Sequence, residues 1–104
     1  MQEYNNMRLL KLFEEVKEEN LNKEQLEQYF SELSQLMAQV VLELAEKEKE
    51  EGIFMGENIE EKTATRKREW KRSQSGQRLI QLKAYKTAGN LVLQSIKTRI
   101  YAKL

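Results

Sequence analysis

The sequence predicts an all-α protein, a small antiparallel bundle of three to four helices with one long heptad-patterned helix. Proline is absent and only four glycines occur, so few positions can break a helix. Apolar residues recur at helical spacing in three segments. The segments are joined by short connections, which are typical of antiparallel neighbouring helices.

The first predicted helix covers residues 2–19. Its apolar stripe consists of Leu9, Phe13 and Val16, widened by Met7 and Leu10. A boundary is predicted at 20–22, because Asn22 and Gln25 have the spacing of a capping box.

The second predicted helix starts after Asn22 and runs to about Glu51, with Gly52 as its C-cap. Leu21 and Leu26 occupy the positions of a hydrophobic staple. A heptad seam runs along the helix, with spacings of four and three residues, through Leu26, Phe30, Leu33, Met37, Val40 and Leu44. Such a seam requires a partner helix.

Two glycines enclose the apolar residues Ile53, Phe54 and Met55. This link either packs at a helix corner or presents a hydrophobic hook to a partner. A capping-box pattern at Asn58 and Glu61 predicts that a third helix begins near Ile59.

The third predicted helix is unusually polar. Between Glu60 and Arg78 the clearly apolar side chains are Ala64 and Trp70, and the cations spread around the helix. We therefore expect that this helix buries no face.

A final helix is predicted after a cap at Ser73 or Ser75. Its apolar side comprises Leu82, Tyr85, Ala88, Val92, Ile96 and Ile100, flanked by Leu79, Leu91 and Leu93. This helix is the expected partner of the heptad seam. Gly89 lies within the stripe, where it costs roughly 1 kcal/mol relative to Ala unless a close helix contact or a kink compensates.

The length of 104 residues predicts a single domain, 1–104. Within it we distinguish an acidic helical hairpin (1–61), a basic segment (62–78) and an amphipathic basic helix (79–104). The acidic part carries sixteen Glu against six Lys and Arg, a net charge of −10, and the remainder carries one Glu against twelve, a net of +11.

The missing residue types limit the chemistry. The chain has no His, no Cys and no Asp, which removes the usual nucleophile pairs and zinc ligands. We therefore expect no enzyme activity, no metal and no cofactor. The sequence also shows no secretory signal and no apolar run of about 18 residues. A cytoplasmic protein without a membrane partner is the expectation.

The charge distribution predicts a surface that contacts the phosphate backbone of DNA or RNA with low sequence specificity. Arg forks onto phosphate oxygens, Lys adds point charge, and tryptophan stacks on unpaired bases. The candidate residues are Lys62, Arg66, Lys67, Arg68, Trp70, Lys71, Arg72, Arg78, Lys83 and Lys86. The corresponding function is an accessory subunit of a nucleoprotein complex, with other subunits or a second copy contacted through helices.

Other interpretations remain open. In one interpretation, the charged residues of the basic half simply form a solvated helix face. In another, the acidic heptad helix docks on a partner protein, and the chain is a protein-interaction adaptor or inhibitor. A bZIP-like layout lacks the matching Asn/Ala/Arg signature. Binding to a membrane surface is disfavoured because 60–78 lacks the apolar face of an interfacial helix.

Overall fold

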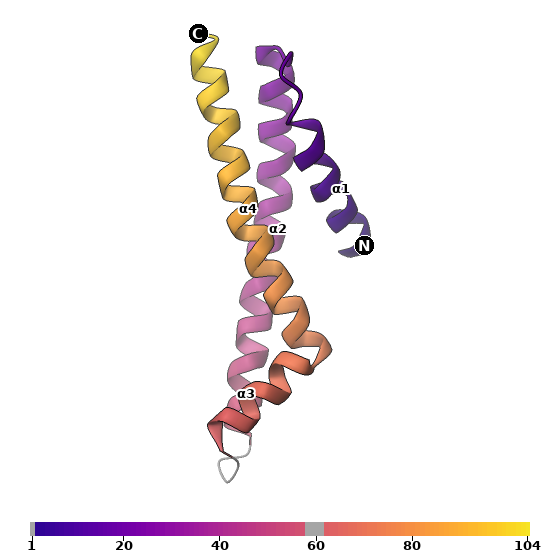
Figure 1. Cartoon of the computed structure of the whole chain (residues 1–104), viewed down its shortest axis with the longest axis vertical. Helices are drawn as coiled ribbons and strands as arrows, with labels where there is room; N and C mark the ends of the chain where they lie inside the picture. The colour runs from indigo at the N-terminus through magenta and orange to yellow at the C-terminus, as the bar shows by residue number, and fades with distance from the viewer. Residues whose placement is uncertain (1, 58–61) are drawn as a thin grey trace. The chain divides into compact units, whose positions relative to one another are not determined.

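The computed structural model describes the backbone of residues 2–57 and 62–104, and their side chains from residue 6 onward. Regular structure in these ranges is entirely α-helical. The helices are α1 (Gln2–Glu15), α2 (Lys23–Gly56), α3 (Thr63–Arg72) and α4 (Gln74–Ala102) (Figure 1). The predicted all-α class and the long second helix are confirmed.

Contacts within the chain divide it into two compact units. Unit 1 combines Met1–Gln39 with Lys86–Leu104, and unit 2 is Val40–Tyr85. Unit 1 thus contains α1, the first half of α2 and the second half of α4. Unit 2 contains the rest of α2, all of α3 and the start of α4. These contacts lie inside each unit and do not test whether the two units form one domain. The single-domain organisation therefore stays a prediction.

The buried side of α1 differs partly from its predicted stripe. Leu9 and Leu12 are fully buried and Val16 is buried, whereas Met7 and Leu10 are 72% and 48% exposed. Leu12 was missing from the predicted stripe. It lies one helical turn before Val16, so both side chains reach the same core.

The first helix ends at Glu15, four residues earlier than predicted. Turn-like bonds follow, from the Lys17 amide to the Glu14 carbonyl and from the Glu18 amide to the Glu15 carbonyl. The guanidinium of Arg99 on α4 donates to the Val16 carbonyl at 2.5 Å and to the Glu18 carbonyl at 2.6 Å. A cation from a distant helix therefore satisfies carbonyls at the end of α1.

The start of α2 confirms the predicted capping box. The Gln25 amide donates to Asn22 Oδ1 at 2.8 Å, and the Asn22 amide donates to Gln25 Oε1 at 2.9 Å. Leu21 and Leu26 are both buried, as expected for the staple.

The heptad seam of α2 is covered by this chain itself. Its buried members are Leu26, Leu33, Met37, Val40 and Leu44, and Phe30 is half-buried. In unit 1, a Cβ added at Gly89 of α4 would lie 2.1 Å from Met37 Sδ. Gly89 therefore permits a close contact between the two helices, as the sequence suggested.

The prediction that Gly52 ends α2 is wrong. The helix continues through Gly52 to Gly56, and neither glycine has a positive φ. Phe54 follows Val40 by two heptads, so its side chain continues the buried face of the seam. A tertiary contact of Phe54, described below, stabilises this last turn.

Ser73 is the single residue between α3 and α4. Its hydroxyl oxygen accepts the Gly76 amide at 3.0 Å, which confirms Ser73 as a cap of the final helix. The predicted cap at Asn58 and Glu61 and the helix start near Ile59 lie outside the described residues. The described part of α3 begins at Thr63.

We expect Gly76→Ala to destabilise the protein by about 1–3 kcal/mol. An added Cβ would lie 1.7 Å from the Trp70 carbonyl oxygen, which belongs to the backbone and cannot rotate away. The matched control is Gly52→Ala, whose Cβ meets nothing within 4 Å. This control should stabilise the protein by about 0.5–1 kcal/mol through helix propensity. Urea unfolding measures both, and equal effects would contradict the tight corner.

The Arg8–Glu32 pair in unit 1 should make stability dependent on pH. Arg8 donates two hydrogen bonds to Glu32, at 2.6 and 2.7 Å, and these lower the pKa of Glu32 from 4.5. The pair stabilises the fold at pH values above the usual pKa of a glutamate. This contribution is lost as the pH falls through the lowered pKa of Glu32. Because Glu32 is partly exposed, we expect Glu32→Gln to cost at most about 1 kcal/mol at pH 7. In urea titrations, a loss that does not shrink at pH 3 would argue against this pair.

Candidate nucleic-acid interface

The basic helix α3 does bury a face, contrary to the expectation from its composition. Arg66 and Trp70, one turn apart, are 9% and 6% exposed. Both contact Phe54 in the last turn of α2, beside which α3 lies in Figure 1. The Arg66 Cζ atom is 3.9 Å from the centre of the Phe54 ring. The Trp70 and Phe54 ring centres are 5.5 Å apart, with planes tilted by 44°.

The charge of Arg66 is used inside unit 2. Its Nη2 donates to the Phe54 carbonyl oxygen. Its guanidinium also lies 3.5 Å from the carboxylate of Glu69 and 3.9 Å from that of Glu57. A planar guanidinium can combine stacking on a ring with hydrogen bonds at its edge, which a lysine cannot do. Arg66 is therefore part of the fold.

Trp70 is not placed to stack on a base. Its side chain is buried against Phe54, and its carbonyl oxygen accepts the Ser73 hydroxyl at 2.6 Å. The interpretation of Trp70 as a stacking residue is therefore corrected, and we assign it to the packing of α3 on α2.

Arg78 on α4 is also held within unit 2. Its Nε and Nη2 donate to the two carboxylate oxygens of Glu43 at 2.5 and 2.7 Å, and its Nη1 donates to Gln81 Oε1 at 2.6 Å. The hydrogen bond with Glu43 raises the pKa of Arg78. This fork-like pair joins α4 to α2. Arg78 is likewise removed from the candidate interface.

The four other cations of α3 are exposed. Lys67, Arg68, Lys71 and Arg72 make no ion pair with any residue that the structure describes. At about 100° per residue they occupy an arc of about 140°, in the order Lys67, Lys71, Arg68 and Arg72. Arg68 lies opposite the middle of the buried face. We call these residues the α3 cation face.

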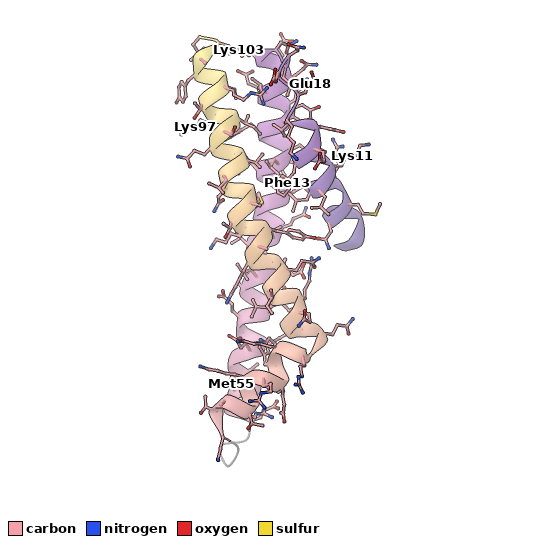
Figure 2. The ribbon with its side chains drawn as sticks, viewed as in Figure 1. Lys11, Phe13, Glu18, Met55, Lys97 and Lys103 are labelled. Carbon is pink, nitrogen blue, oxygen red and sulfur yellow. The ribbon has the colours of Figure 1, made fainter. Side chains whose placement is uncertain are left out.

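The remaining candidate residues surround α3 less closely. Lys62 is exposed at the N-cap of α3, and Lys83 is exposed on the part of α4 in unit 2. Lys86 is exposed but belongs to unit 1. Unit 1 also carries Lys97 and Lys103, exposed near the end of α4 (Figure 2).

Sequence reasoning missed Phe54 and Glu43 as partners of the basic half. The signal for Phe54 was its position two heptads after Val40. The signal for the buried side of α3 was the four-residue spacing of Arg66 and Trp70, which places them on one helix face. No comparable signal identifies Glu43 among the many acidic residues.

The described residues were also compared with the requirements of a metal site and of a membrane-spanning helix. Among them there is no group of three or more acidic, His or Cys side chains that could hold a metal. None of their helices is long and apolar enough to cross a membrane.

The chain matches no protein-family model, no curated protein and no solved structure.

The burial of Trp70 makes a spectroscopic prediction. As the single tryptophan, it should emit at short wavelength in the folded protein and resist quenching by iodide. Both properties should change to those of exposed tryptophan in urea. Quenching of the folded protein as strong as that of the unfolded chain would contradict the packing on Phe54.

Proposed function

We propose that this chain is a non-enzymatic protein that binds the phosphate backbone of nucleic acid through the α3 cation face. One observation carries the proposal. Four exposed cations lie on a single short helix whose folding contacts are made by Arg66 and Trp70. The folding role of α3 is thus separate from these four charges, and a polyanion is the ligand that matches them.

Charge repulsion supports this function. Lys67 and Lys71 are four residues apart, as are Arg68 and Arg72. Like charges at this spacing destabilise a helix by a few tenths of a kcal/mol per pair, about 0.2–0.5. The neighbouring Glu69 forms its ion pair with Arg66 and with none of these four cations. A bound phosphate backbone removes this cost and releases counterions.

The wider role proposed here is that of an accessory subunit of a nucleoprotein complex, with no catalysis, metal or cofactor of its own. We also propose that the helices pack as an antiparallel bundle. Three contacts support such packing within unit 1: Arg8–Glu32, Arg99–Val16 and Gly89–Met37.

A second candidate function is supported by a different surface. The heptad seam of α2 is buried by the chain itself, so it is not the surface that a protein partner would contact. In unit 2, however, α2 exposes Val41 (45%), Leu42 (68%) and Ile53 (56%). Contiguous exposed apolar patches are typical of protein contacts. An adaptor function would need these side chains to form part of such a patch.

We expect the change of Lys67, Arg68, Lys71 and Arg72 together to Gln to weaken nucleic-acid binding at least tenfold, about 1.4 kcal/mol or more. Anisotropy of a labelled oligonucleotide, measured over a range of salt concentrations, tests this. The log–log salt slope of the unaltered protein should become shallower in the variant by about 0.9 for each lost phosphate contact on duplex DNA.

The matched control uses lysines of unit 1. Lys67→Gln with Lys71→Gln should weaken binding more than Lys97→Gln with Lys103→Gln, although both pairs remove two exposed charges. Circular dichroism should remain the same in all variants, because none of these side chains is buried. Equal losses from both pairs would show nonspecific attraction by net charge, and a protein that binds no nucleic acid at low salt would rule out the function.

A further inference from the structure

We infer that the ligand of the α3 cation face is B-form duplex DNA, and that α3 lies along its major groove with Lys67 and Lys71 toward one strand and Arg72 toward the other. This inference rests on the proposed function and names the class of nucleic acid. It is carried by the convex shape of the site, the angular order of the four cations and the burial of Trp70.

The shape of the site is that of a helix exposed on one side. Arg66 and Trp70 occupy the inner side of α3, so the outer side is free to enter a groove. An α-helix with its side chains is about 10–12 Å wide, and the major groove of B-DNA is about 12 Å wide. A convex helix surface fits such a groove, whereas a single strand is usually held in a concave channel.

The order of the cations around α3 matches two strands. Lys67 and Lys71 lie together at one edge of the exposed arc and Arg72 lies at the other, while Arg68, opposite the buried face, lies between them. Between Lys67 and Lys71 the rise is about 6 Å, four residues at 1.5 Å each. Long cationic side chains at the two edges of an arc of about 140° point toward opposite walls of a groove. Each wall of the major groove is one phosphate backbone.

Near the start of α3 the exposed arc carries a small residue. Ala64 is exposed and projects between the two edges, one turn before Lys67 and Arg68. Its methyl group leaves room for the floor of the groove near the start of α3. No Asn or Gln lies on α3, so the bidentate amide contact that identifies adenine is missing from this helix.

Two other nucleic acids fit less well. The major groove of A-form RNA is deep and narrow, so a helix does not enter it. Proteins that hold single strands stack bases on aromatic side chains. The α3 cation face has no aromatic residue, and the tryptophan of this helix is buried against Phe54. Duplex DNA is therefore favoured over both.

The experiment compares three labelled probes of one mixed sequence, a DNA duplex, the corresponding RNA duplex and the single DNA strand, with the full-length protein at fixed salt. We expect the DNA duplex to bind at least about tenfold more tightly than either other probe. Methyl green, which occupies the major groove, should displace the protein. Netropsin, which occupies the minor groove, should not.

The possible failures are distinguishable. Equal or tighter binding of duplex RNA or the single strand would overturn the inference and leave backbone binding intact. Displacement by netropsin but not by methyl green would overturn the groove assignment. The variant with Gln at all four positions should lose the preference for duplex DNA, and a retained preference would also overturn the inference. Absence of binding to every probe would overturn the proposed function itself.

Discussion

The packing of Arg66 and Trp70 on Phe54 is the contact on which the arrangement of unit 2 depends. The helix α3 has ten residues, too few to be stable alone in water. Its orientation therefore comes from this contact, which buries the tryptophan ring and places a guanidinium on the last turn of α2. Because a helix C-terminus carries a partial negative charge, the cation of Arg66 is well matched to the carbonyl that it contacts.

Two groups of cations can be distinguished in the basic half. Arg66, Arg78 and Arg99 donate to carbonyl or carboxylate oxygens of distant segments, and they join helices together. The α3 cation face has no such role and stays in solvent. The structural group consists entirely of arginines, because a planar fork with several donors can satisfy two acceptors at once. Composition alone gives the total charge but not this division.

Close contacts at two glycines are a second constraint. Gly76, in the first turn of α4, has the Trp70 carbonyl of α3 where a side chain would lie. At Gly89, in unit 1, α4 contacts Met37 of the heptad seam. The acidic helix α2 consequently finds its partner within its own chain. Its heptad seam is buried in the folded chain, and a protein partner would have to contact the exposed apolar residues of α2 instead.

The sequence by itself determined the all-α class, the capping box at Asn22 and the buried seam, because periodicity and caps are local properties of the chain. Only the tertiary structure decided where α1 and α2 end. Arg99 of α4 donates to carbonyls at the end of α1, and Phe54 in the last turn of α2 packs against α3. It also decided which cations of α3 are exposed. A charged side chain such as Arg66 becomes buried only when a ring, a carbonyl and carboxylates from other turns are assembled around it. The spacing of Arg66 and Trp70 places both on one helix face but does not identify these partners.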